Sequence, residues 1–151
     1  MKKKVLILGS TGSIGRATLD IIDEQSNSFE VLGLVCKDNI QLLNTQIQKF
    51  KPAYVSVYDN HLMSQVKFPK KRLLPGMKGI KDLVGMDADI VMNAMPGSIG
   101  LEPSIEALKK DKLLALANKE SMVMAGRLVR KILQQGNGSL IPVDSEHSAL
   151  Y

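Results

Sequence analysis

Apolar residues recur along this chain with two different periods. Short unbroken runs, such as Val-Leu-Ile-Leu at residues 5–8, have the length of a buried β-strand. Between these runs, apolar residues return at every third and fourth position, which is the period of a helix with one buried face. In residues 14–25, for example, Ile14, Ala17 and Ile21 share one side of such a helix. Strand-like and helix-like segments therefore follow one another from the first residues onward.

The same alternation continues to the end of the sequence. We expect strands at residues 5–8, 29–36, 53–58, 72–74, 89–94, 112–117 and 139–143. We expect helices at residues 14–25, 40–50, 61–66, 78–84, 103–110 and 121–134. The pattern is least regular between residues 61 and 85. Alternating strands and helices predict an α/β fold, with a doubly wound, mostly parallel sheet and helices on both faces, in a Rossmann-like arrangement.

Three glycines follow the first apolar run at intervals of three residues: Gly9, Gly12 and Gly15. Glycine permits positive φ in a turn, close approach of a ligand to the backbone, and tight packing of the new helix. The N–H groups of the first helical turn would then face a ligand above the loop and favour a pyrophosphate. The spacing is not the commoner G-x-G-x-x-G, so the strand before it and the helix after it carry the interpretation. We expect a dinucleotide site here; a purely structural glycine turn is the alternative.

The second expected strand, Phe29–Cys36, ends in Lys37-Asp38-Asn39. In proteins that bind NAD, an acidic side chain at this place accepts hydrogen bonds from the adenosine ribose. Lys37 would instead attract a 2′-phosphate, which favours NADP, although Asp38 beside it opposes that preference. An ordinary loop lysine explains Lys37 equally well.

Polar residues follow two of the later strands. Asn118, Lys119 and Glu120 separate an apolar strand from a helix, where the lysine would suit a carbonyl or phosphate ligand and the asparagine a nicotinamide amide or ribose. Simple capping of the helix is the alternative for this group. Asp144 and Glu146 stand two residues apart, so both carboxylates project to one side of an extended segment and suit Mg²⁺ or Mn²⁺. An ordinary surface pair is the alternative there.

Composition narrows the possible partners. The chain has 151 residues, 44% of them hydrophobic, which suits one domain with a sizeable core. Its net charge of +5 is consistent with solvent-exposed basic surfaces that attract phosphorylated ligands. Three Phe, three Tyr and no Trp leave few aromatic side chains that could stack on the bases of a nucleic acid. A single cysteine, Cys36, excludes an internal disulfide and suits a reducing compartment. No apolar stretch is long enough for a signal peptide or a membrane span, so we expect a cytoplasmic protein without nucleic-acid or membrane partners.

Taken together, three motifs resemble the 1-deoxy-D-xylulose 5-phosphate reductoisomerase family: the glycine loop at residues 9–15, Leu-Ala-Asn-Lys-Glu-Ser at 116–121, and Pro-Val-Asp-Ser-Glu-His at 142–147. Their order and spacing match that family over essentially the whole chain. The resemblance implies an NADPH-dependent enzyme of non-mevalonate isoprenoid biosynthesis that also uses Mg²⁺ or Mn²⁺. Such an enzyme rearranges a phosphorylated ketose and reduces the resulting aldehyde to 2-C-methyl-D-erythritol 4-phosphate, and the full-length protein is expected to be a homodimer.

The resemblance also assigns roles by motif position. It implies that Thr11, Gly12, Ser13 and Ile14 hold the pyrophosphate, that Asn39 lies near the 2′-phosphate, and that Asn118 and Glu120 contact NADPH. The glycine spacing and the end of the second strand add Gly9, Gly15 and Lys37 to the expected cofactor-binding residues. Asp144 and Glu146 are the expected metal ligands, and Lys119, Ser145 and Glu146 the expected catalytic residues.

Two departures from the family pattern qualify these expectations. Lys37-Asp38 stands where relatives often have glycine or a second basic residue. The chain stops at Tyr151, before the family's third metal carboxylate, active-site flap and substrate-phosphate residues. We therefore expect residues 1–151 to be the NADPH-binding domain of a longer enzyme, without its catalytic and C-terminal domains and inactive alone. The alternatives are a different reductase, of the semialdehyde dehydrogenase type, and a non-catalytic nucleotide-sensing module.

Overall fold

The computed structural model describes residues 1–117 and 119–143, with side chains outside residues 119–122. Its strands are β1 (Lys3–Leu8), β2 (Phe29–Cys36), β3 (Tyr54–Val57), β4 (Leu73–Pro75), β5 (Ile90–Asn93), β6 (Leu113–Leu116) and β7 (Ser139–Pro142). Its α-helices are α1 (Ser13–Glu24), α2 (Ile40–Phe50), α3 (Gly76–Val84), α4 (Leu101–Lys109) and α5 (Lys119–Gln135). Three 3-10 helices complete the order: η1 (Asn60–Gln65), η2 (Lys70–Arg72) and η3 (Gly97–Gly100).

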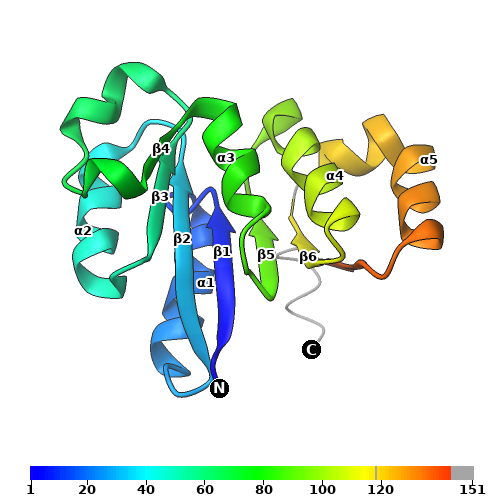
Figure 1. Ribbon diagram of the computed structural model, residues 1–151, viewed down its shortest axis with the longest axis horizontal. Helices are drawn as coiled ribbons and strands as arrows, with labels where there is room; N and C mark the ends of the chain where they lie inside the picture. The colour runs from blue at the N-terminus through cyan, green and yellow to red at the C-terminus, as the bar shows by residue number, and fades with distance from the viewer. Residues whose placement is uncertain (118, 144–151) are drawn as a thin grey trace.

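The strands form one seven-stranded sheet in the order β4-β3-β2-β1-β5-β6-β7 (Figure 1). Every neighbouring pair in this order is parallel, so the expected mostly parallel sheet is parallel throughout the described chain. From β1 the chain adds strands outward on one side and then returns to add β5 on the other. The order therefore reverses between β1 and β5, and ligands of doubly wound sheets bind outside the carboxyl ends of the strands at such a point.

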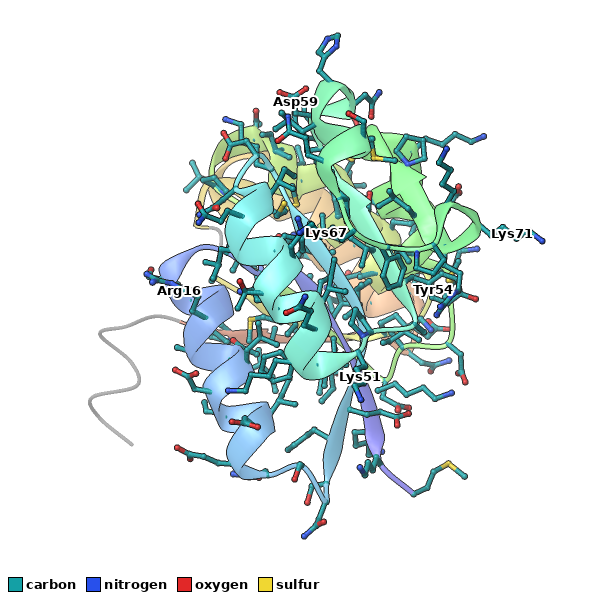
Figure 2. All side chains as sticks on the ribbon, turned by 90° about the vertical axis from the view of Figure 1, so that its left-hand side faces the viewer. Arg16, Lys51, Tyr54, Asp59, Lys67 and Lys71 are labelled. Carbon is teal, nitrogen blue, oxygen red and sulfur yellow. The ribbon has the colours of Figure 1, made fainter. Side chains whose placement is uncertain are left out.

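Successive side chains of a strand point to opposite faces of the sheet, so the core has two separate layers, one on each face. On one face Leu6 and Leu8 of β1 pack with Leu83 of α3, Leu108 of α4 and Val129 of α5. The opposite layer joins Val5 and Ile7 of β1 to Leu19 and Ile22 of α1 and to Leu43 and Ile47 of α2. Figure 2 shows α1 and α2 side by side on this second face, where the Lys49 Nζ lies 3.0 Å from an Asp23 carboxylate oxygen. Helices on both faces were expected and are confirmed.

The irregular stretch between residues 61 and 85 differs most from expectation. The expected helix at residues 61–66 is the 3-10 helix η1, which starts where Asp59 Oδ1 accepts a hydrogen bond from His61 N at 3.1 Å. A 3-10 helix lacks the 3.6-residue period on which the expectation was based. The helix expected at residues 78–84 starts earlier, because Gly76 adopts φ +57° and turns the chain directly from β4 into α3.

In the part of the chain that the structure describes, we find no helix with the length and apolar character needed to span a membrane.

Candidate functional site

The loop after β1 depends on two of its three glycines for its shape. Gly9 adopts φ +87°, and a Cβ atom there would lie 2.7 Å from the Ala94 carbonyl oxygen. Gly15 lies buried in the first turn of α1, where a Cβ would lie 2.1 Å from the Gly9 carbonyl oxygen. Both distances are too short for any side chain, so the turn and the seating of α1 require glycine. The expectation of a tight glycine turn is confirmed at these positions.

Gly12 differs from both of them. It is the exposed N-cap of α1, with φ −78°, and the nearest neighbour of a Cβ there would be the Gly9 oxygen at 3.6 Å. That is an ordinary van der Waals contact, so the free protein has room for a side chain at this position. The packing of the free protein therefore does not require glycine at position 12, and the backbone there is exposed.

The start of α1 presents unpaired N–H groups and positive partial charge to this accessible space. Among the residues that the structure describes, no side chain caps the helix, and its first turn contains no acidic residue. The first N–H groups of an α-helix have no partner within the helix, and together with the helix dipole they favour an anion. Ser13, in that first turn, is exposed and Thr11 is half-buried. Chemically, the loop suits a phosphate or pyrophosphate, as the sequence predicted.

A buried glutamine of α2 forms a hydrogen bond with the loop after β1. Gln46 of α2 donates from Nε2 to the Ser10 carbonyl oxygen at 2.8 Å, and both residues are buried. Sequence reasoning missed Gln46, although a polar residue between Leu43 and Ile47, on the buried stripe of α2, was a visible signal. A buried hydrogen bond across 36 residues fixes the position of the loop relative to α2.

A second buried network builds the turn after β5. Asn93 Nδ2 donates to the Gly100 carbonyl oxygen and to Ser104 Oγ, both at 2.8 Å, while its Oδ1 accepts from Met95 N at 3.2 Å. Ala94 N in turn donates to the Leu8 carbonyl oxygen at 2.8 Å. The two loops that flank the strand-order reversal are thus held against each other. The sequence placed Asn93 in a strand and gave no sign of this role.

The residues expected at the 2′-phosphate lie at the end of β2. Lys37 and Asp38 are exposed and line a hollow of about 440 Å³, together with Tyr58, His61 and other residues that follow β3 or begin α3. Asn39 caps α2, because its Oδ1 accepts a hydrogen bond from Leu42 N at 3.2 Å. Lys37 and the exposed His61 therefore line the same hollow.

The remaining expected site residues lie largely outside the described chain. Asn118, Asp144, Ser145 and Glu146 fall outside the described residues, as do the side chains of Lys119 and Glu120 at the start of α5. The structure does show where the two segments begin. Leu116 of β6 pairs with Pro142 of β7, and Val143 N donates to the Leu116 carbonyl oxygen at 2.9 Å, so the chain leaves both strands at one edge of the sheet. Within residues 1–117 and 119–143 no group of three His, Cys, Asp or Glu side chains is placed to hold a metal ion.

Cys36 closes β2 with a side chain that is fully buried. Burial, and after it the charge of Asp38, raises the pKa of the Cys36 thiol to about 12. We predict that this thiol stays protonated at pH 8 and does not react with a disulfide reagent in the folded protein, because the thiolate is the nucleophile. The same reagent should titrate one thiol after unfolding in guanidinium. Prompt reaction of the folded protein at pH 8 would contradict the burial of Cys36.

Comparison with known proteins agrees with this geometry. Residues 5–126 match the family model of 1-deoxy-D-xylulose 5-phosphate reductoisomerase. The enzyme of that name from Thermoanaerobacter sp. (strain X514) is 45% identical over 151 residues, covering 98% of this chain and 40% of the relative. That from Thermodesulfovibrio yellowstonii is also 45% identical, covering 99% of this chain and 40% of the relative.

Solved structures of reductoisomerases also match this chain. The reductoisomerase from Zymomonas mobilis in complex with NADPH matches with a TM-score of 0.90 and 33% identity, over 97% of this chain and 40% of that one. A DOX-P reductoisomerase in complex with NADPH, fosmidomycin and magnesium matches with a TM-score of 0.88 and 31% identity, over 96% of this chain and 37% of that one. Homoserine dehydrogenase from S. aureus, 20% identical with a TM-score of 0.56, shares the fold alone.

The match extends along nearly all of this chain, yet the chain spans only 40% of the length of the curated relatives. The family model covers most of the sequence, including the glycine loop, the turn after β5 and the start of α5. On these findings the chain belongs to the 1-deoxy-D-xylulose 5-phosphate reductoisomerase family.

Proposed function

We propose that this chain is the NADPH-binding part of an enzyme that converts 1-deoxy-D-xylulose 5-phosphate to 2-C-methyl-D-erythritol 4-phosphate. The observation that carries the proposal is the uncapped, exposed start of α1 at Gly12, beside the point where the strand order reverses. A bare helix N-terminus with no acidic residue near it is suited to a pyrophosphate. The NADPH complex of the Zymomonas mobilis relative supports the choice of dinucleotide.

On this proposal the dinucleotide crosses the carboxyl edge of the sheet. Its pyrophosphate lies over residues 11–14, where the backbone N–H groups of α1 receive it. Its adenosine end extends toward the hollow at the end of β2, where Lys37 offers a positive charge to a 2′-phosphate. Asn118 and Glu120 are proposed NADPH contacts because they follow β6 at the same edge of the sheet. NADPH supplies the hydride, and the residues of the protein orient it.

The metal and the substrate are proposed to bind where β6 and β7 end. Asp144 and Glu146 offer the carboxylate oxygens that Mg²⁺ and Mn²⁺ prefer, so the donor set fits the metal. A divalent cation there acts as a Lewis acid toward carbonyl and hydroxyl oxygens next to the rearranging C–C bond. Lys119 and Ser145 are proposed to hold the phosphorylated ketose. Two protein carboxylates leave most of an octahedral shell to water, so we propose that residues 1–151 bind the metal weakly and are inactive alone.

We also propose an oligomeric state and a cellular compartment for the longer enzyme. We propose a homodimer, as the family resemblance implies, that works in the cytoplasm. The one cysteine of this chain is a buried free thiol, which suits a reducing compartment.

A preference for NADPH over NADH tests the cofactor part of the proposal. We predict that Lys37→Gln lowers NADPH affinity at low salt by roughly fivefold, because an exposed lysine–phosphate contact contributes about 1 kcal/mol. NADH affinity should stay unchanged, and the difference between the cofactors should shrink as salt rises. Isothermal titration calorimetry measures all four affinities, with the exposed Lys71→Gln as the control variant. Equal affinities of the unmodified chain for NADPH and NADH at low salt would contradict the assignment.

A further inference from the structure

Gln46 is a buried polar residue on the apolar face of α2. It is 5% exposed and stands between Leu43 and Ile47, which belong to the core layer under α1 and α2. Its Nε2 donates to the Ser10 carbonyl oxygen at 2.8 Å. Within the described part of the chain, its Oε1 is buried without a hydrogen-bond partner. A buried acceptor without a partner costs free energy, so packing alone does not explain a glutamine at this position.

The hydrogen bond from Gln46 fixes the direction of one peptide group in the glycine loop. The carbonyl and N–H groups of a planar trans peptide point in opposite directions, so the Thr11 N–H points away from Gln46. Among residues 1–117 and 119–143, that N–H has no hydrogen-bond partner. Ser10 is fully buried, Thr11 is half-buried and Gly12 is exposed, so the outer side of the loop begins at Thr11. The Thr11 N–H is therefore available to a ligand above the loop.

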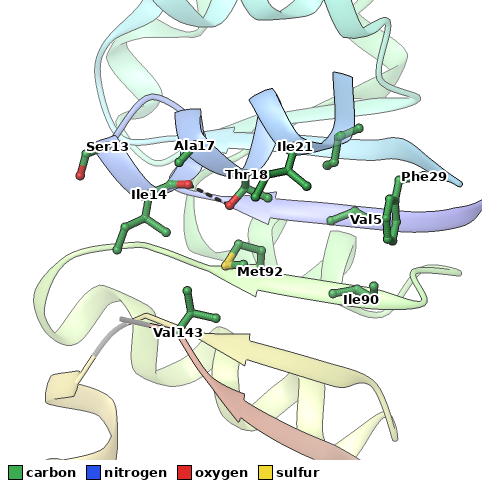
Figure 3. A pocket seen from close by; sticks show the side chains of 11 residues that line it. Val5, Ser13, Ile14, Ala17, Thr18, Ile21, Phe29, Ile90, Met92 and Val143 are labelled. Atoms are coloured by element: carbon green, nitrogen blue, oxygen red, sulfur yellow. Dashed lines mark hydrogen bonds between the residues drawn. The ribbon is translucent and has the colours of Figure 1, made fainter. Parts of the chain in front are cut away.

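The neighbouring parts of the loop are fixed by other contacts. Gly9 N and Ser10 N both donate to the Val35 carbonyl oxygen of β2, at 2.8 and 2.9 Å. In the helix that follows, the Thr18 hydroxyl donates to the Ile14 carbonyl oxygen at 2.8 Å (Figure 3). The peptide after Ser10 is held instead by a side chain from α2. A substitution of that side chain can therefore alter this peptide without breaking the other contacts.

We propose that Gln46 is a positioning residue for the cofactor, which aims the Thr11 N–H at the pyrophosphate that the glycine loop receives. The inference rests on the proposed function, in which that loop binds NADPH. The N–H groups of Thr11 and of the first turn of α1 then surround one anion, as successive backbone N–H groups do in other phosphate sites. α2 also begins at Asn39, beside the proposed site of the 2′-phosphate. The same helix is thus linked to both proposed phosphate sites.

Steady-state kinetics of the full-length enzyme test this role with Gln46→Met. Methionine keeps the length and most of the volume of the side chain but cannot donate a hydrogen bond to Ser10. We expect KM for NADPH to rise at least about tenfold, because a hydrogen bond to a charged phosphate oxygen contributes about that factor in affinity. At saturating NADPH, kcat should change by less than about twofold, since the lost contact holds the cofactor equally in the ground state and the transition state. Calorimetric titration of NADPH should show the same loss in Kd.

Ile47→Val is the matched control, because Ile47 is buried on the same face of α2 and its side chain forms no hydrogen bond. It should lower the melting temperature and leave KM for NADPH unchanged. Gln46→Glu is a second variant of nearly the same shape. Its ionised carboxylate cannot donate to the Ser10 carbonyl at pH 8, so KM for NADPH should rise at least as much as in Gln46→Met.

Three results would overturn the inference while the proposed function stands. The first is a KM for NADPH in both Gln46 variants equal to that of the unmodified enzyme. The second is a loss of kcat with unchanged KM, which is the effect of partial unfolding. The third is a rise of KM in Ile47→Val as large as that in Gln46→Met. Absence of NADPH-dependent turnover and of NADPH binding in the unmodified enzyme would instead contradict the proposed function, and this inference with it.

Discussion

Gly15→Ala lowers the free energy of unfolding by about 3 kcal/mol or more, because overpacking against rigid surroundings is among the costliest substitutions. The added Cβ would meet the Gly9 carbonyl oxygen at 2.1 Å, and neither partner is a flexible side chain. Relief requires α1 to move away from the turn, which also disturbs the packing of Leu19 and Ile22. For a domain of this size the change corresponds to a fall in melting temperature of roughly 10 °C.

Gly12→Ala is the matched control for this prediction. Its Cβ would find only the Gly9 oxygen at 3.6 Å, so the expected cost is the poorer N-cap, about 1 kcal/mol or less. Thermal unfolding followed by circular dichroism compares the two variants directly. Equal melting temperatures would show that the contact between α1 and the turn does not constrain the fold as described.

Asp144→Asn and Glu146→Gln each remove a proposed metal ligand and should lower kcat of the full-length enzyme at least about a hundredfold. The reason is that the metal is proposed to supply several kcal/mol of transition-state stabilisation, and each factor of ten in rate corresponds to about 1.4 kcal/mol. NADPH affinity should remain unchanged in both variants, because the carboxylates are proposed to hold the metal and not the cofactor. Steady-state kinetics at saturating Mg²⁺ or Mn²⁺ measures the effect.

Asp82→Asn, at an exposed position of α3, is the control carboxylate for that experiment. It should leave turnover unchanged. Near-normal turnover in Asp144→Asn or in Glu146→Gln would show that the substituted residue is an ordinary surface carboxylate and not a metal ligand.

Much of the fold followed from local patterns. The bounds of β2 and α2 agree with expectation residue by residue, because a mostly apolar run and a clean helical stripe each end at polar or proline-containing sequence. The expected strand at residues 72–74 is present as β4, one residue later, but η1 and η2 were not predicted as 3-10 helices, because such helices lack the 3.6-residue period. Short-range signals specify elements well only where an element is long enough to repeat them.

The candidate site likewise contains residues that local sequence patterns predicted and residues that they did not. The glycine loop was visible because its chemistry is local: Gly9 and Gly15 meet each other within one turn. Gln46 and Asn93 were missed because each acts through partners that only the folded chain brings near, 36 residues away for Gln46. Polar residues on buried stripes are the signal that such long-range contacts leave in a sequence.

We propose that the exposed backbone at Gly12 receives a dinucleotide, and calorimetric titration of NADPH into the unmodified chain and into Gly12→Val tests this proposal. The fold tolerates a side chain at this position, so both proteins should melt within a few degrees of each other. We predict that the unmodified chain binds NADPH and that Gly12→Val binds it at least about tenfold more weakly, because the side chain blocks approach to the N–H groups of α1. Unchanged NADPH affinity in Gly12→Val, with the fold intact, would show that the dinucleotide does not bind over Gly12.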